Sequence, residues 1–105
     1  MMKGFVYLLC DGEHFKIGMT KQKDIHKRIS ELQTGNPNKI YITSFHETNY
    51  PYRIEQMMHI RYGSSRVKNE WFNLTLEQVI NFNKNCNKCE ETLQVLKDNP
   101  YIKMC

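Results

Sequence analysis

The sequence predicts an α+β domain in which a small three-stranded antiparallel sheet is flanked by helices, in the order β-β-α-β-α-α. Three observations lead to this prediction: two strand-like runs joined by a turn signal, a third alternating run at residues 39–45, and helical spacing of apolar residues elsewhere. With 105 residues, the chain has room for one domain. We expect a single unit over residues 1–105, with a core at residues 4–74 and a helical extension at residues 75–105.

The first two strands are expected to form an antiparallel hairpin. Phe5 to Cys10 is an apolar run typical of a buried strand. Asp11-Gly12 follows and is a strong signal for a two-residue turn. Polar and apolar residues then alternate from His14 to Met19, which places Lys16 and Gly18 on the face opposite the apolar residues.

Three helices are expected around these strands. The first begins after Asp24, which is a favourable N-cap residue, and ends at Gly35. The second begins near Pro51, because proline is tolerated in the first turn, and ends at a Gly-Ser-Ser sequence. The third begins at a capping box formed by Thr75 and Gln78. Several asparagines weaken the middle of this last helix, so we expect that it can break there.

Composition and charge narrow the range of functions. The net charge is +4 and the sequence pI is about 8.9, which permits a polyanionic partner without requiring one. The first apolar run ends at Asp11 and is too short for a secretory signal or a membrane span. We therefore expect an intracellular protein, in the cytoplasm or the nucleus, with free thiols and no membrane association. The lack of alanine and the abundance of Asn, Lys, Ile and Tyr indicate an AT-rich genome, as in some viruses.

Five sequence blocks occur in an order that resembles the GIY-YIG nucleases. The first two are Gly4-Phe5-Val6-Tyr7 and, after eight residues, Lys16-Ile17-Gly18-Met19-Thr20. The other three are Lys27-Arg28 with Glu31-Leu32-Gln33-Thr34-Gly35-Asn36-Pro37, then Glu55 with His59, then Glu70-Trp71-Phe72. The blocks extend from about Gly4 to Leu74, and their combination is most similar to the compact phage and viral branch of the family.

The resemblance implies hydrolysis of phosphodiester bonds in DNA with one divalent ion, Mg²⁺ or Mn²⁺. It implies that Tyr7 helps to activate the attacking water, that Arg28 contacts the scissile phosphate and that Glu55 holds the ion. These roles agree with the chemistry of the side chains, because a guanidinium matches two phosphate oxygens and a carboxylate suits Mg²⁺. Tyrosine is a poor base at its usual pKa of roughly 10, so Tyr7 would need cationic neighbours.

Lys16 stands where the second motif of the family usually has tyrosine. On the sheet face of Tyr7, it would lower the pKa of that phenol or contact phosphate. His59 lies one turn after Glu55 and is expected either to assist the metal site or phosphate binding, or to make a structural hydrogen bond. His14 is a weaker candidate for a phosphate contact.

The last block has two interpretations. Glu70 either supports the catalytic site or, together with Trp71 and Phe72, mainly closes the core. The compact branch usually has glycine before this glutamate, whereas this chain has Asn69. The late asparagine of the family has one candidate here, Asn73.

Two further alternatives stay open. The alternative function is a catalytically inactive DNA-binding or interaction module on the same fold, and the lysine at position 16 favours it. Cys86-Asn87-Lys88-Cys89 permits a zinc site with Cys105 and a histidine, although burial on an apolar helix stripe explains both cysteines with fewer assumptions. DNA is the expected partner, and a homodimer formed through the C-terminal helix would provide the two sites that a double-strand cut needs.

Overall fold

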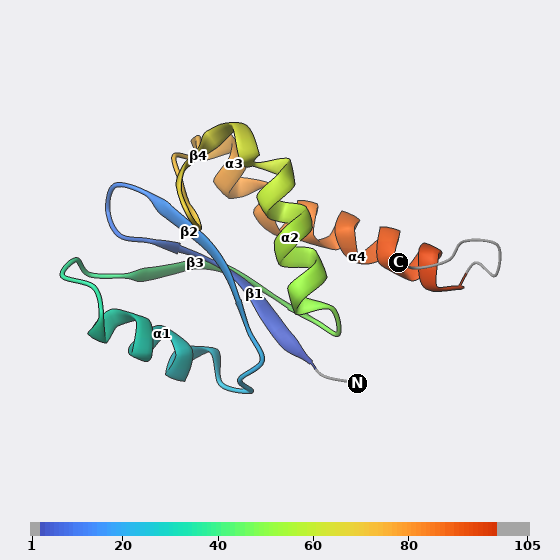
Figure 1. The fold of residues 1–105 in the computed structure, drawn as a ribbon, viewed down its shortest axis with the longest axis horizontal. Coiled ribbons are helices and arrows are strands. Elements are labelled where there is room, and N and C mark those ends of the chain that lie inside the picture. Colours follow the sequence, from blue (N-terminus) through green and yellow to red (C-terminus); the bar gives the residue numbers. More distant parts are fainter. Residues whose placement is uncertain (1–2, 99–105) are drawn as a thin grey trace.

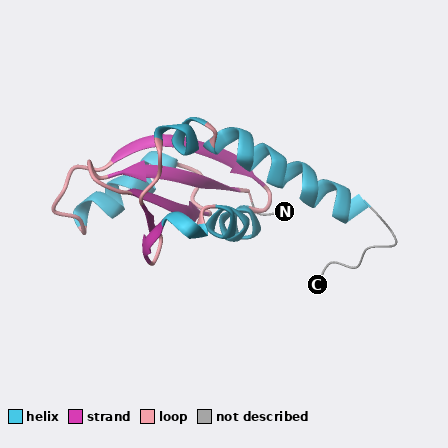
Figure 2. Ribbon diagram, turned by 90° about the horizontal axis from the view of Figure 1, so that it is seen from above, coloured by secondary structure: helices cyan, strands magenta, loops and turns pink. Residues whose placement is uncertain are grey.

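The computed structural model describes residues 3–98, and its elements confirm the α+β class. Figure 1 shows α1 on one side of the strands and α2 with α4 on the other, and Figure 2 shows α4 extending beyond the sheet. Within the described residues, no helix is long and apolar enough to cross a membrane. The elements are β1 (Gly4–Cys10), β2 (Phe15–Thr20), α1 (Ile25–Thr34), β3 (Tyr41–Thr48), α2 (Pro51–Arg61), a 3-10 turn (Gly63–Ser65), β4 (Arg66–Lys68), β5 (Trp71–Phe72), α3 (Leu76–Ile80) and α4 (Phe82–Asp98).

The sheet has five strands, in the order β3-β1-β2-β5-β4, so the prediction of three strands is wrong. The two additional strands, β4 and β5, contain three and two residues. All residues of β4 are exposed, so this strand has no apolar alternation that a sequence pattern would reveal. Strands this short form because the neighbouring strand is already in place to pair with them, which is a tertiary effect.

The β1–β2 hairpin brings Tyr7 and Lys16 to one face of the sheet. The antiparallel register places Tyr7 opposite Gly18 and Leu9 opposite Lys16, and residues opposite one another share a face. The loop differs from the predicted two-residue turn, since it covers residues 11–14. The Asp11 carboxylate accepts hydrogen bonds from the backbone N–H groups of Glu13 and His14. Asp11 is therefore the start of the turn rather than its centre.

The sheet separates two hydrophobic clusters. On one face, α1 packs against strand residues, and the buried members are Tyr7, Leu9, Ile25 and Ile40. On the other face, α2 and α4 cover a larger cluster that includes Val6, Leu8, Ile17, Ile54, Met58, Phe72, Phe82, Cys86 and Cys89. Successive residues of β1 therefore serve different cores, and Tyr7 belongs to the α1 face.

The helix ends follow the local signals in the sequence. The Asp24 carboxylate accepts the backbone N–H of His26 and caps α1. Thr75 and Gln78 form the predicted capping box at the start of α3. The asparagine-rich stretch breaks the expected last helix at Asn81, which separates α3 from α4.

Candidate functional site

The site is built on the outer edge of β2. Strand β5 pairs with β2 only at Phe15 and Lys16, so it leaves the following half of that edge uncovered. The N–H of Ile17 donates to the carbonyl of Glu70 at 3.1 Å, and the carbonyl of Ile17 lies 2.8 Å from Nε2 of His59. A single residue of β2 thus anchors both the β4–β5 turn and helix α2.

The hydrogen bonds of His59 define how its ring is protonated. A carbonyl oxygen can only accept, so the Nε2 that faces the Ile17 carbonyl carries the proton. The lone pair is then on Nδ1, which lies 3.3 Å from a guanidinium nitrogen of Arg66. The imidazole also packs edge-on against Phe72, with 5.3 Å between ring centroids. His59 therefore makes a structural hydrogen bond and has its second nitrogen engaged as well.

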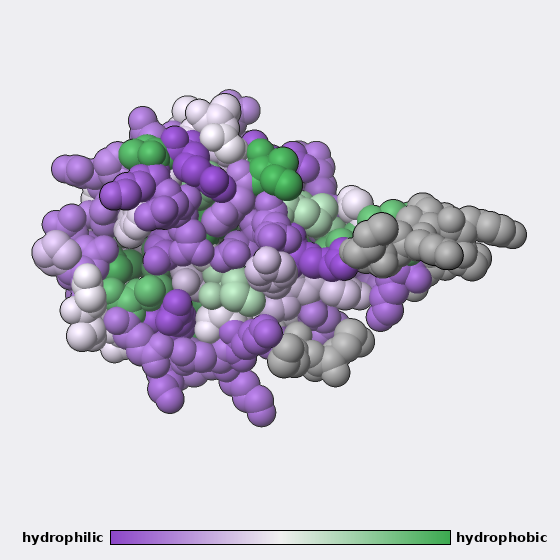
Figure 3. All heavy atoms as spheres, in the orientation of Figure 1, coloured by the Kyte–Doolittle hydropathy of each residue, from purple (hydrophilic) through white to green (hydrophobic). Residues whose placement is uncertain are grey.

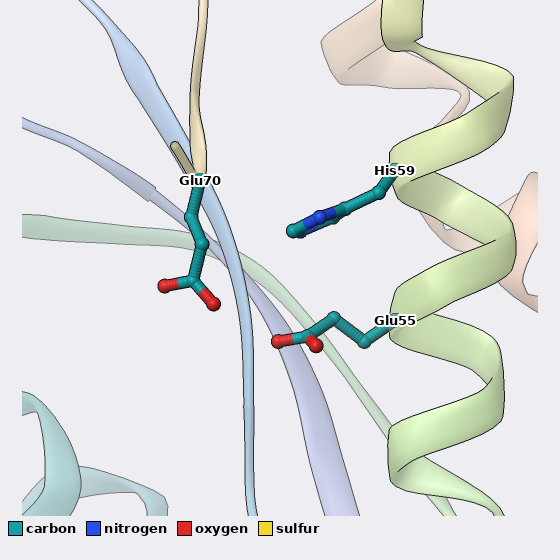
Figure 4. Close-up of side chains that lie close together, drawn as sticks. All are labelled: Glu55, His59 and Glu70. Carbon is teal, nitrogen blue, oxygen red and sulfur yellow. The ribbon is translucent and has the colours of Figure 1, made fainter. Parts of the chain in front are cut away.

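Glu55, His59 and Glu70 form a cluster that could hold a metal ion. One ligand atom from each side chain lies within 4.8 Å of the other two. Figure 4 shows Glu55 and His59 on successive turns of α2, with Glu70 approaching from the β4–β5 turn and its carboxylate facing that of Glu55. Because α2 packs on the face opposite Tyr7, the cluster lies where the two faces meet, at the uncovered part of the β2 edge.

The two carboxyl groups form a hydrogen-bonded pair. Burial, the charge of Glu70 and a hydrogen bond with Glu70 together raise the pKa of Glu55 to about 7, while the charge of Lys16 opposes the shift. The physical cause is that two partly desolvated carboxylates at short range do not both ionise easily. The pair therefore holds a shared proton more readily than an isolated glutamate would.

The backbone at Asn69 turns the chain so that Glu70 faces the site. Asn69 has a φ of +54°, in the left-handed region that favours glycine and that asparagine tolerates better than most residues. Asparagine at position 69 is therefore suited to this conformation. The sequence permits two interpretations of Glu70, and the structure brings its carboxylate close to Glu55. The sequence signal for a functional Glu70 is a charged residue directly before the aromatic pair Trp71-Phe72.

Lys16 pairs with Glu70. Its Nζ lies 3.5 Å from Oε2 of Glu70 and 5.8 Å from the centroid of the Trp71 ring. The Lys16 side chain is only 18% exposed and that of Glu70 is 41% exposed, so the pair is partly shielded from water. The cation that hydrogen-bonds the Tyr7 hydroxyl is a different one, Arg28.

The Tyr7 hydroxyl is buried at the base of this group. Tyr7 is 1% exposed, and its ring lies directly over Gly18. Burial raises the pKa of Tyr7, the hydrogen bond to Arg28 and its charge lower it, and the carboxylates of Glu70 and Glu55 raise it. The net shift is upward, so the phenol is protonated at neutral pH in the free protein.

Arg28 reaches Tyr7 from α1. A guanidinium has only donors, so Arg28 donates to the phenolic oxygen and leaves the Tyr7 proton free to point elsewhere. The side chain is 35% exposed, and its NH1 lies 3.7 Å from the Glu31 carboxylate. Its Nε is buried and has no hydrogen-bond partner among residues 3–98. An oxygen acceptor placed there would satisfy this donor.

Three other candidates lie apart from this group. His14 is in the hairpin loop, where it faces Asp11. The Asn73 backbone donates to Ser65 at 2.8 Å, and its residue is exposed. Cys86 and Cys89 are buried in the larger cluster, and burial raises the pKa of Cys86 to about 12. In the part of the chain that the structure describes, neither cysteine joins a metal-binding group, and Cys105 lies outside the described residues.

The surface around the site is suited to a charged partner. Figure 3 shows a predominantly hydrophilic face with small apolar areas. Exposed basic residues occur in the β2–α1 loop, in α1 and in β4: Lys21, Lys23, Lys27, Arg66 and Lys68. The α+β domain thus combines exposed basic residues with a Tyr–Arg pair and two carboxyl groups.

Comparison with known proteins shows the family of the chain. Residues 4–89 match the family model described as T5orf172 domain, so the chain belongs to the T5orf172 domain family. This family is phage-associated and nuclease-related, and it identifies the chain as a nuclease-like or DNA-interacting module. Searches of curated proteins and of solved structures find no significant match.

Proposed function

We propose that this chain is a metal-dependent DNA endonuclease of the GIY-YIG type that hydrolyses phosphodiester bonds. The observation that carries the proposal is the Tyr7–Arg28 hydrogen bond next to the Glu55–Glu70 carboxyl pair. The four groups come from separate elements of the fold, and the charges of both carboxylates act on the Tyr7 hydroxyl. Membership in a nuclease-related family supports the same conclusion.

Arg28 is the residue that binds the scissile phosphate. Its side chain is 35% exposed, so part of the guanidinium is accessible to a phosphate. The planar guanidinium can engage two phosphate oxygens at once. The i,i+3 pairing with Glu31 holds the side chain near this position before substrate binds.

Tyr7 orients the attacking water and receives its proton as the phenolate, after its own O–H proton has passed to solvent. Arg28 already donates to the phenolic oxygen, so the Tyr7 O–H is directed away from Arg28. Because the pKa of Tyr7 is raised, little phenolate forms at neutral pH, and the role requires positive charge near the hydroxyl. Arg28 supplies part of this charge, and Lys16, which lies on the same sheet face, would add to it on leaving Glu70.

The Glu55 and Glu70 carboxylates suit a divalent ion of the Mg²⁺ or Mn²⁺ type. Both are hard oxygen donors, and they face each other with a proton between them that a cation can replace. A bound ion would supply Lewis-acid stabilisation of the charge that develops on the phosphate and on the leaving oxygen.

The test is nicking of supercoiled plasmid in the presence of Mg²⁺ or Mn²⁺. Wild-type protein converts plasmid to the open-circular form, and Glu55→Gln loses the activity by about a hundredfold or more. Glu77→Gln removes an exposed carboxylate from α3 and serves as the matched control, which keeps full activity. Activity that Glu55→Gln leaves intact contradicts the proposal.

The second candidate is a DNA-binding module without catalysis. The nearly complete burial of Tyr7 favours it, because a hydroxyl that is 1% exposed also suits a purely structural tyrosine. Plasmid binding without nicking, unchanged in Glu55→Gln, would identify the chain as this module.

A further inference from the structure

The Glu55–His59–Glu70 cluster offers three potential metal ligands, but their hydrogen bonds distinguish them. The Nε2 of His59 is committed to the Ile17 carbonyl, and its Nδ1 faces the positively charged Arg66. A metal ion at Nδ1 would have to displace a guanidinium that also packs over the Phe72 ring at 5.5 Å. His59 is therefore engaged on both sides as a positioning residue that fixes α2 against β2.

Glu70 has the opposite character. Its backbone carbonyl is fixed by the N–H of Ile17, while its carboxylate is 41% exposed and faces Glu55. Opposite donors around a Mg²⁺ ion lie about 4.2 Å apart, since each donor is roughly 2.1 Å away. Ligand atoms within 4.8 Å of one another need only a small side-chain adjustment to reach this geometry.

The Glu70 carboxylate is already paired with the ammonium group of Lys16. Lys16 lies 3.5 Å from Glu70 and also lowers the pKa of Glu55 by its charge. A divalent ion bound between the carboxylates would repel the ammonium strongly, because the repulsion between charges of +2 and +1 is double that of two single charges. The Trp71 ring already lies 5.8 Å from the same ammonium, and this contact does not depend on Glu70.

We propose that Glu70 is a second carboxylate ligand of the divalent ion, and that the ion takes Glu70 over from Lys16. This inference rests on the proposed function. Loading of the ion then releases Lys16 from its ion pair and leaves its charge for the Tyr7 hydroxyl and the substrate phosphate. Lys16 is thus a competitor of the metal in the free protein and a helper of the reaction in the loaded protein.

Because Lys16 competes with the ion, its removal should strengthen metal binding, whereas removal of a residue that supports the site would weaken it. In calorimetric titrations with Mn²⁺, Lys16→Met binds the ion about tenfold more tightly than wild type, because a nearby positive charge is gone. Glu70→Gln binds at least about tenfold more weakly, because a charged ligand is lost. In the double variant the Lys16 substitution has a smaller effect than in wild type, since the competition for Glu70 is gone and only the charge of Lys16 near Glu55 remains.

Three control variants separate this effect from general ones. Lys88→Met removes an exposed positive charge from α4 and shifts the Mn²⁺ affinity by less than about twofold, because exposed charges are screened. Lys16→Arg keeps the charge and stays near wild type. His59→Gln keeps a donor for the Ile17 carbonyl and changes the affinity by less than about threefold, whereas a ligand would cost more.

The native protein also contains a local reporter of the exchange. Trp71 is the single tryptophan of the chain and lies beside the Lys16 ammonium. Titration with Mg²⁺ changes the tryptophan emission of wild-type protein with saturation, and the amplitude falls in Lys16→Met. Circular dichroism of each variant verifies that the fold is retained.

The outcomes also separate this inference from the proposed function. Unchanged or weaker Mn²⁺ binding by Lys16→Met overturns the exchange, and unchanged binding by Glu70→Gln overturns the role of Glu70, even if wild-type protein nicks DNA. Wild-type protein that binds no Mn²⁺ overturns both. The expected binding pattern in a protein that fails to nick DNA supports the ion exchange and contradicts the endonuclease.

Discussion

The ring of Tyr7 lies across Gly18 of the neighbouring strand, so closely that a β-carbon at Gly18 would lie 2.6 Å from the tyrosine hydroxyl oxygen. The same β-carbon would lie 2.7 and 2.8 Å from two ring carbons. The ring is buried, so it has little room to move aside. The Tyr7 ring can therefore pack against β2 only because residue 18 has no side chain.

Replacement of Gly18 should consequently disturb both stability and activity. We expect Gly18→Ala to destabilise the fold by about 1–3 kcal/mol through overpacking, and to reduce plasmid nicking because the Tyr7 hydroxyl is displaced. Urea unfolding and the nicking assay measure the two effects. Gly63→Ala is the matched control, since a β-carbon there meets nothing within 4 Å. A fully stable and active Gly18→Ala protein would show that the ring is not held as described.

The Tyr7 hydroxyl can be separated from the Tyr7 ring. Tyr7→Phe keeps the packing on Gly18 and removes the acceptor for Arg28, so we expect a small change in stability and an activity loss of about a hundredfold or more. Tyr62→Phe is a matched control. Its hydroxyl is also hydrogen-bonded, to Asn85, but it lies in the cluster beneath α4. Retention of full cleavage by Tyr7→Phe rules out the proposed role.

The raised pKa of Glu55 predicts a pH-dependent stability. Its folded-state pKa of about 7 lies above the ordinary value of 4.5, so the folded state binds the proton more tightly. The resulting stabilisation is complete below pH 4.5 and is lost as pH rises through 7. In chelator-treated protein, the free energy of unfolding of wild type relative to Glu55→Gln should therefore fall between these pH values. A difference that is independent of pH would mean that the carboxyl pair is not coupled.

The buried cysteines predict a fold that does not depend on zinc. Cys86 is 0% exposed and Cys89 is 3% exposed, and the Cys89 sulfur lies 3.9 Å from that of Met58. We expect Cys86→Ala to lose about 0.5–3 kcal/mol from reduced packing, and a zinc-selective chelator to leave the unfolding midpoint of wild type unchanged. Elemental analysis of the purified protein gives an independent check. One zinc ion per chain, lost in Cys86→Ala, would restore the zinc hypothesis.

Local patterns predicted those parts of the molecule that local rules govern. The N-cap at Asp24, the capping box at Thr75 and the shared face of Tyr7 and Lys16 all depend on periodicity or on short-range hydrogen bonds. The alternation that predicted the third strand also continues in β3, although the strand begins and ends later than the pattern suggested. These features need no knowledge of distant contacts.

The remaining features depend on distant contacts. Strands β4 and β5 exist because β2 offers an edge, and five residues provide too little pattern to reveal them. The sequence placed Lys16 near Tyr7, but whether Lys16 or Arg28 would hydrogen-bond the phenol depends on how α1 packs across the sheet. The participation of Glu70 depends in turn on the left-handed backbone at Asn69.

The shortness of β5 has a consequence for the whole domain. Because β5 pairs with β2 at only two positions, residues 17–20 of β2 have no strand partner on that edge. At this unpaired part of the β2 edge, the Glu55 carboxyl group from α2 lies near Tyr7 and Arg28 on the α1 face of the sheet. If β5 paired with two more residues of β2, the sheet would gain hydrogen bonds. The longer strand would also separate the groups on the α1 face from those on the α2 face. Part of the β2 edge thus stays without a strand partner, and groups from both faces of the sheet can contribute to one candidate site.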